Sequence, residues 1–182
     1  MKKNIFLLLA TVLINLTGYT QAATEKITIE DNHGKNKLEL KLPKDYTIKK
    51  AASFTTILDN YSTLWAVTYE NDKVVLTSTP TTRFLDDNGI PGFTDQLISI
   101  VREKKREVKS LDDGILLEDG KNIGYIKFYS KESNQKKYNY LFYISAGDQL
   151  VLFNFSCPKK LRKSWETVAE EIASSLRVAK SA

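Results

Sequence analysis

The run Leu150-Val151-Leu152-Phe153-Asn154-Phe155 constrains the fold of this chain more than any other segment. Successive side chains of a β-strand point to opposite faces of the sheet, so a strand with one solvated face alternates apolar and polar residues. In this run both alternating sets are apolar except for Asn154. Because such a strand needs cover on both faces, we expect a sheet with a layer packed on each side.

Two amphipathic segments can supply those layers. A helix is predicted to begin near Pro91, because Phe93, Leu97, Ile100 and Val101 recur at helical spacing. The clearest helical pattern closes the chain, where six apolar residues share one face: Leu161, Trp165, Val168, Ala169, Ile172 and Leu176. We therefore expect helices on the two faces of the sheet.

Short apolar runs separated by turn residues predict the strands. Residues 26–30 and 37–42 form an opening hairpin, and residues 64–69 and 74–79 form a second pair that Pro80, which lacks an amide hydrogen, is expected to end. Further strands are predicted at residues 115–117, 123–129, 138–144 and 150–155. Their short connections favour antiparallel neighbours, since a parallel crossover needs about a dozen residues. The predicted class is α+β, a mainly antiparallel sheet sandwiched between helices (an α/β/α sandwich), with residues 49–61 left ambiguous.

Residues 1–22 have the three parts of a secretory signal peptide: Lys2 and Lys3, an apolar run over residues 5–14, and a polar stretch ending at Ala22. Cleavage after Ala22, or alternatively after Ala23, leaves one domain over residues 23–182. An uncleaved anchor is disfavoured because this ten-residue run spans about half of a roughly 30 Å hydrocarbon core. Tyr19 stands where a bacterial lipoprotein carries cysteine. We expect a periplasmic protein that is not a lipoprotein.

The basic excess is modest and dispersed. The formal charge of +5 includes two lysines of the predicted signal. Basic clusters at residues 104–106, 136–137 and 159–163 are interrupted or flanked by acids, so no stripe of one sign is sustained. This pattern, together with export, excludes nucleic acid as the expected partner. Solvated surface is the leading interpretation of the clusters, and contact with anionic lipid headgroups is the alternative.

Side chains that carry most catalytic chemistry are scarce. The chain has one histidine, His33 in a turn-like stretch, and one cysteine, Cys157, expected to be a small half-buried thiol. The paired acids Asp112 and Asp113 precede Gly114, which indicates a turn rather than acid–base catalysis. We therefore expect no catalytic residue, metal or cofactor. A hydrolase that uses His33 with Asp112 and Asp113 is the weakest of the functional hypotheses.

Aromatic residues gather in three successive predicted strands. The eight members are Phe128, Tyr129, Tyr138, Tyr140, Phe142, Tyr143, Phe153 and Phe155. Most are expected in the core of a doubly covered sheet. Tyrosine also has a polar end that suits interfaces, so Tyr129, Tyr138 and Tyr143 are candidate partner-binding anchors wherever they are left uncovered.

Several segments resemble the PsbP-like family, which includes the DcrB-like envelope proteins. The resembling segments are Leu40-Lys41-Leu42-Pro43-Lys44-Asp45-Tyr46, the helix from Gly92-Phe93, Gly147-Asp148-Gln149 and Ser174-Ser175-Leu176. The resemblance covers residues 38–178. It implies an antiparallel sheet between helices and no enzymatic activity, since relatives are assembly factors, accessory subunits or chaperone-like binders. DcrB-like members often carry a lipid anchor, from which Tyr19 departs.

The leading hypothesis is an exported, non-catalytic binding or assembly protein of the bacterial cell envelope. It would dock an envelope or imported protein partner, in an accessory, chaperone-like or toxin-immunity role. The alternative is a periplasmic carrier of a small apolar ligand or lipid, motivated by the aromatic strands. Contact with a membrane surface, the binding face and the oligomeric state are left open.

Overall fold

The structure is a computed structural model, which describes residues 23–30, 37–50, 54, 61–104, 107–132 and 134–179. The predicted signal peptide, His33 and most of the ambiguous segment 49–61 lie outside these residues. The regular elements follow one another as β1 (Thr24–Glu30), β2 (Lys37–Pro43), β3 (Thr47–Lys49), β4 (Trp65–Tyr69), β5 (Val74–Phe84), η2 (Asp87–Gly89), α1 (Ile90–Lys104), β6 (Lys109–Glu118), β7 (Lys121–Glu132), β8 (Gln135–Ala146), β9 (Gln149–Pro158), η3 (Lys159–Leu161), α2 (Arg162–Ser174) and β10 (Arg177–Val178).

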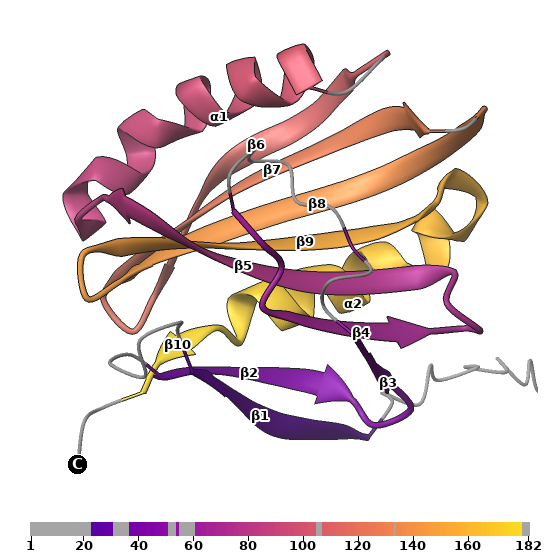
Figure 1. Ribbon diagram of the computed structural model, residues 1–182, viewed down its shortest axis with the longest axis horizontal. Coiled ribbons are helices and arrows are strands. Elements are labelled where there is room, and N and C mark those ends of the chain that lie inside the picture. The colour runs from indigo at the N-terminus through magenta and orange to yellow at the C-terminus, as the bar shows by residue number, and fades with distance from the viewer. Residues whose placement is uncertain are drawn as a thin grey trace, which may run out of the picture.

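Seven strands form the main sheet, in the order β3-β4-β5-β9-β8-β7-β6 (Figure 1). Strands β6 to β9 follow one another as antiparallel hairpins, and β5 joins this meander by pairing with β9. All the pairs are antiparallel, as the short connections predict. The predicted pairing of residues 26–30 with 37–42 is also confirmed, because β1 and β2 pair in a separate three-stranded sheet of order β1-β2-β10.

Strand β9 is covered on both faces, as its sequence requires. Leu150 and Leu152 pack with the buried face of α1, while Phe153 and Phe155 pack with α2 on the opposite side. Helix α1 runs across one face of the sheet and α2 lies against the other (Figure 1). Each fully buried apolar side chain of this kind contributes about 1.5–3 kcal/mol relative to an exposed one, so the two clusters hold the helices to the sheet.

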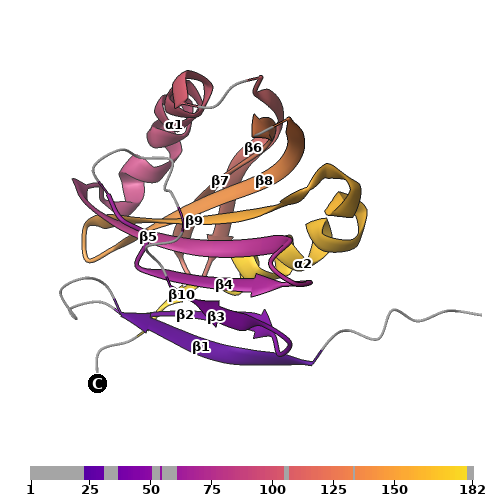
Figure 2. The ribbon, with the colours of Figure 1, turned by 45° about the vertical axis from the view of Figure 1, so that its right-hand side comes forward.

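The expectation of helices as the cover on both faces is correct only for α1. The opposite face is covered by α2 together with the three-stranded sheet, which lies below the main sheet in Figure 2. Leu38, Leu40 and Leu42 of β2 are buried in the same cluster as Trp165 and Ile172 of α2. The alternating leucines give the opening hairpin its own apolar face, and that face is buried by stacking on the main sheet rather than by extending it.

Pro80 does not end β5, contrary to the sequence-based expectation. It lies opposite Val151, and the strand continues to Phe84 after a shift in register. The hydroxyl of Thr81 donates a hydrogen bond of 2.8 Å to the carbonyl of Leu150. A side-chain donor thus bridges the two strands directly after the residue that lacks an N–H, so the proline is tolerated as an irregularity within the strand.

The predicted turn between β4 and β5 is confirmed. Glu70, Asn71 and Asp72 all have positive φ, at 49°, 53° and 68°. Asn and Asp tolerate this region better than most residues. Asp72 is fixed by hydrogen bonds from Lys49 Nζ (2.8 Å) and Thr68 Oγ1 (2.6 Å), which hold the pKa of its carboxyl below the ordinary value. The turn therefore has a defined shape.

Candidate functional site

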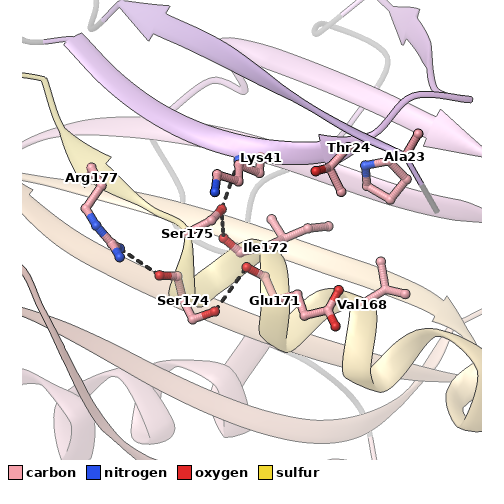
Figure 3. A pocket seen from close by; sticks show the side chains of 10 residues that line it. Ala23, Thr24, Lys41, Val168, Glu171, Ile172, Ser174, Ser175 and Arg177 are labelled. Carbon is pink, nitrogen blue, oxygen red and sulfur yellow. Dashed lines mark hydrogen bonds between the residues drawn. The ribbon is translucent and has the colours of Figure 1, made fainter. Parts of the chain in front are cut away.

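A groove of about 590 Å³ lies between β2 and the C-terminal end of α2 (Figure 3). Lys41 and Pro43 line it from β2, while Val168 and Glu171 line it from α2. Ala23, the first residue that the structure describes, also faces it. The groove therefore lies where the three-stranded sheet meets the helix that covers the main sheet.

Ser175 joins the two walls of the groove. The backbone N–H of Lys41 donates to Ser175 Oγ at 2.9 Å, and the same hydroxyl donates to the carbonyl of Ile172 at 2.7 Å. Strand β10 pairs with β2 at Arg177–Glu39 and Val178–Leu38. Continued in the other direction, the same register places Ser175 opposite Lys41, where the next strand residue of the ladder would lie. The serine hydroxyl thus provides a hydrogen-bond partner both for a strand N–H and for a carbonyl at the end of the helix.

Beyond Glu39, this edge of β2 has no strand partner among the residues that the structure describes. The N–H and C=O of one strand residue lie on the same edge, so the carbonyl of Lys41 faces the same side as its N–H. No described residue donates to that carbonyl from a neighbouring strand, because β10 begins only at Arg177. Pro43 adds a second carbonyl with no competing N–H. This edge of β2 therefore offers two acceptor carbonyls to the groove, while the Lys41 N–H is held by Ser175.

Arg177 closes the end of α2 and holds the groove in shape. Its guanidinium donates to the carbonyls of Ser174 (2.6 Å) and Leu176 (2.7 Å), which are left without helical partners at the C-terminus. It also donates to Glu118 at 3.0 Å and pairs with Asp119. Ser174 Oγ donates to the carbonyl of Glu171 at 3.1 Å. These polar groups are occupied within the fold, so they position the groove.

Lys41 and Glu171 offer the unpaired charges of the groove. Both side chains are exposed, and neither makes an ion pair within the described ranges. Val168 and Ile172 add apolar surface between them. A strand edge flanked by one cation, one anion and apolar side chains suits an extended polypeptide, which presents backbone groups and alternating side chains together.

The three predicted anchor tyrosines lie in the interior. Tyr143 packs edge-to-face on Phe93 of α1 and shares a 2.6 Å hydrogen bond with Thr94, and burial raises its pKa to about 12. Tyr138 is fully buried, and its hydroxyl donates to Glu166 at 3.3 Å. Burial is the main cause that raises the Tyr138 pKa, with the Glu166 charge next. Packed in this way, these two side chains are core residues.

Tyr129 is the most accessible of the three, at 8% exposure. Its hydroxyl accepts a hydrogen bond of 2.8 Å from Arg162 Nη1. The ammonium groups of Lys136 and Lys159 lie 5.1 and 5.5 Å from the centre of its ring. A partner-anchor role for Tyr129, Tyr138 and Tyr143 stays a prediction, and their burial gives it no direct support.

The prediction of a turn at Asp112 and Asp113 is wrong, because both residues lie within β6 and pair with Lys127 and Ile126 of β7. Asp112 accepts from the hydroxyl of Tyr125 (3.3 Å) and pairs with Lys127 (3.5 Å) on the α2 side of the sheet. Asp113 lies opposite Ile126, which belongs to the α1 cluster. Because neighbouring strand residues point to opposite faces, the two carboxylates cannot act on one substrate atom in this arrangement.

Lys127 is a feature that sequence reasoning missed. Its side chain is 11% exposed and forms a 2.5 Å ion pair with Glu170 of α2, while its ammonium lies over the rings of Tyr125 and Tyr140. Burial by itself lowers the Lys127 pKa, but the hydrogen bond and charge of Glu170, followed by Asp112, outweigh it and leave the pKa raised. A lone lysine between Ile126 and Phe128 in an apolar strand is the sequence signal for this ion pair.

Cys157 is fully buried at 1% exposure, more deeply than expected. Burial raises its pKa to about 12, so the thiol stays protonated at neutral pH and is a poor nucleophile. Among the described residues, no group of three or more His, Cys, Asp or Glu side chains is arranged to hold a metal ion. Neither described helix is long and apolar enough to cross a membrane.

No family model and no curated protein matches the chain. Solved structures do resemble it. The PsbP protein of the cyanobacterium Synechocystis has a TM-score of 0.59 at 13% identity, covering 92% of this chain and 99% of its own. LpqN of Mycobacterium tuberculosis, which is involved in cell envelope biogenesis, has a TM-score of 0.51 at 9% identity, covering 86% of this chain and 92% of its own.

A Pseudomonas aeruginosa protein of unknown function also has a TM-score of 0.51, at 7% identity, covering 86% of this chain and 99% of its own. At such identities the likeness concerns the fold alone. The predicted PsbP-like fold is therefore confirmed, while the likeness to DcrB stays a prediction.

Proposed function

We propose that this chain is an exported, non-catalytic binding protein of the bacterial cell envelope, and that it docks an extended segment of a protein partner in the groove between β2 and α2. The observation that carries the proposal is the edge of β2 beyond β10, where the carbonyls of Lys41 and Pro43 receive no hydrogen bond from a described strand and can accept from the N–H groups of a docked segment. Added backbone pairing supplies affinity at such an edge, and flanking side chains supply selectivity.

The charges of the groove favour a segment of mixed sign. A partner acidic side chain would pair with Lys41, and a basic side chain would pair with Glu171. Each such exposed pair contributes only about 0.2–1 kcal/mol. Selectivity therefore comes mainly from rejecting a segment whose charges are reversed.

Export and envelope location rest on the predicted signal peptide, and the fold of LpqN, a protein involved in cell envelope biogenesis, is in keeping with them. Cleavage after Ala22 would leave the new ammonium group of Ala23 in the groove that Glu171 also lines. Processing would then add a cation to the docking surface. A protein cleaved one residue later, after Ala23, would place that charge on Thr24 instead.

A charge-reversal pair tests the docking site. The double variant Lys41→Glu with Glu171→Lys keeps the net charge, and a matched control exchanges Arg102 and Glu103 (Arg102→Glu with Glu103→Lys) on the exposed surface of α1. After crosslinking in the native envelope, we expect one stoichiometric partner with the wild type and the control, and at least a tenfold lower yield with the groove variant. Equal yields from all three proteins would contradict docking in the groove.

The carrier of a small apolar ligand or lipid remains the alternative. Its motivating observation, the aromatic strands, is accounted for by packing: Phe142 and Phe153 stack with ring centres 5.1 Å apart, and Tyr140 packs on Phe142. Native mass spectrometry distinguishes the two functions. A bound lipid retained through purification would favour the carrier, whereas the bare mass together with capture of a partner favours docking.

A further inference from the structure

A second charged surface lies at the opposite end of α2 from the groove. Lys73, Lys136, Lys159 and Lys160, hereafter the lysine cluster, line a hollow of about 410 Å³ together with Gln135 and Pro158. The lysines come from the β4–β5 turn, the start of β8 and η3. Figure 1 shows these segments at the same end of the main sheet, with the N-terminal end of α2 beside them.

All four lysines are exposed, and none makes an ion pair with a carboxylate in the part of the chain that the structure describes. The nearest acids along the chain are held by other groups. Glu132 pairs with Lys137 at 2.8 Å, and Glu166 pairs with Arg162 at 2.8 Å. Glu70 accepts a hydrogen bond from Trp165 Nε1. The indole is uncharged, so Glu70 keeps its charge, but the four lysines still outnumber it and carry an excess of positive charge that no ion pair of the described residues cancels.

An aromatic ring helps to hold these cations together. Lys136 Nζ and Lys159 Nζ lie 5.1 and 5.5 Å from the centre of the Tyr129 ring, and the Arg162 guanidinium lies 5.5 Å from it. The face of an aromatic ring attracts a cation without cancelling its charge. Tyr129 thus gathers the ammonium groups and leaves them available to an external anion.

We infer that the lysine cluster binds the phosphate-bearing headgroups of an anionic lipid surface. Acidic and phosphorylated peptides are usually recognised by the planar fork of arginine. The one guanidinium here, Arg162, already donates to Glu166 and Tyr129. A lysine ammonium is a point charge without a fixed donor plane, so it suits a fluid layer of phosphates, and each lysine adds to the attraction. Pro158 supplies an apolar wall among the lysines.

This contact would orient the molecule. Helix α2 has 13 residues, which span about 20 Å, and it separates the lysine cluster at its start from the groove at its end. With the cluster on the membrane, the groove is held clear of the lipid surface and open to a protein. The inference does not depend on the groove, because the two surfaces share no lining residue.

Vesicle sedimentation of the purified, processed protein tests the inference. The cluster variant carries Lys136→Gln, Lys159→Gln and Lys160→Gln, and the matched control carries Arg102→Gln, Lys109→Gln and Lys121→Gln at exposed positions elsewhere. On vesicles of equal parts phosphatidylglycerol and phosphatidylcholine, we expect the cluster variant to lose about a hundredfold in partitioning, at about fivefold per lysine. The control should lose far less, and pure phosphatidylcholine should bind none of the proteins.

The inference would be overturned if the wild type did not bind the anionic vesicles, whether or not an immobilised acidic protein retained it. It would also be overturned by an equal loss for the cluster variant and the control. Free inorganic phosphate, added with the ionic strength held constant by an equivalent reduction of sodium chloride, should not displace the protein, and displacement would overturn the inference in favour of a soluble phosphate ligand. The groove variant should bind vesicles as the wild type does, so that failure of either proposal is seen separately.

Discussion

The two faces of the seven-stranded sheet are covered in different ways. On one face, α1 packs through apolar side chains, and the Thr94–Tyr143 hydrogen bond is a buried polar contact within that layer. On the other face, α2 and the three-stranded sheet share a larger apolar cluster whose margin is charged, with Lys127 on Glu170 and Arg162 on Glu166. Both proposed binding surfaces lie on this second side.

This difference indicates that the two helices have different roles. Helix α1 contacts the sheet mainly through apolar side chains, and its polar contacts join Thr94 to Tyr143 and Gln96 to Arg83. Helix α2 is tied at its end by Ser175 and Arg177 and at its start by Arg162, so it fixes polar groups at both ends. We therefore expect changes on the α1 side to alter stability, and exposed changes at the ends of α2 to alter binding.

The largest expected effect comes from neighbouring residues of β9 that face the two layers. Phe153→Ala removes a fully buried ring stacked on Phe142 and should cost about 3–5 kcal/mol, while Leu152→Ala on the α1 side should cost about 2–5 kcal/mol. Denaturant unfolding monitored by circular dichroism measures both. A cost below about 1 kcal/mol for either variant would mean that one face is not covered as described.

Adding a methyl group at a glycine tests how tightly the α1 side is packed. A Cβ added at Gly124 would lie against the fully buried ring of Tyr143, whereas one added at Gly92 in α1 meets nothing within 4 Å. Gly124→Ala should therefore cost about 1–3 kcal/mol. Gly92→Ala should be neutral or stabilising by about 0.5–1 kcal/mol. Thermal unfolding of the two variants checks the contrast, which would be refuted by equal shifts of the melting temperature.

The buried thiol predicts the pH dependence on the α2 side. The Cys157 pKa is raised from an ordinary 9.0 to about 12, so the folded state keeps the proton while the unfolded state releases it above pH 9. Stability is therefore full below pH 9 and falls as pH rises, by about 1.4 kcal/mol per unit above 9 from this group. Between pH 8 and 10 the unfolding free energy of the wild type should fall by about 1.4 kcal/mol more than that of Cys157→Ala, because the full slope is reached only about one unit above pH 9.

The smallest expected effect comes from the polar contact in the α1 layer. Thr94→Val replaces the hydroxyl that bonds Tyr143 with a methyl group of similar volume, and should cost about 1 kcal/mol. Combining it with Tyr143→Phe should cost little more than either change alone, because the second change removes the orphaned partner. A double-mutant cycle with strictly additive costs would show that the two hydroxyls do not interact.

Local periodicity was enough to predict most of the regular elements. Both helices and the covered strand β9 follow from spacing alone, since the burial of a residue within one element depends on its neighbours in sequence. The three-stranded sheet did not follow, because β2 is completed by Arg177 and Val178 from the far end of the chain. The continuation of β5 past Pro80 also escaped prediction, since it depends on the bridge from Thr81 to Leu150.

The candidate sites were harder to predict than the fold. Residues 136–137 and 159–163 are basic in sequence, but Glu132 and Glu166 flank them, which predicts a neutralised surface. In the structure those acids pair with Lys137 and Arg162, and Lys73 joins from a distant turn. The groove likewise depends on one bond between the amide of Lys41 and Ser175. Such pairings join distant residues, so no local pattern reveals them.

Site-specific photo-crosslinking in living cells tests the central claim most directly. A photoreactive residue at Val168, in the wall of the groove, should give a single discrete adduct with one envelope protein, and that adduct should disappear in the Lys41→Glu and Glu171→Lys background. The same residue at Arg102 on α1 should give none. The claim would be contradicted by the same adducts from both positions, or by no adduct from the groove in cells that contain the folded, exported protein.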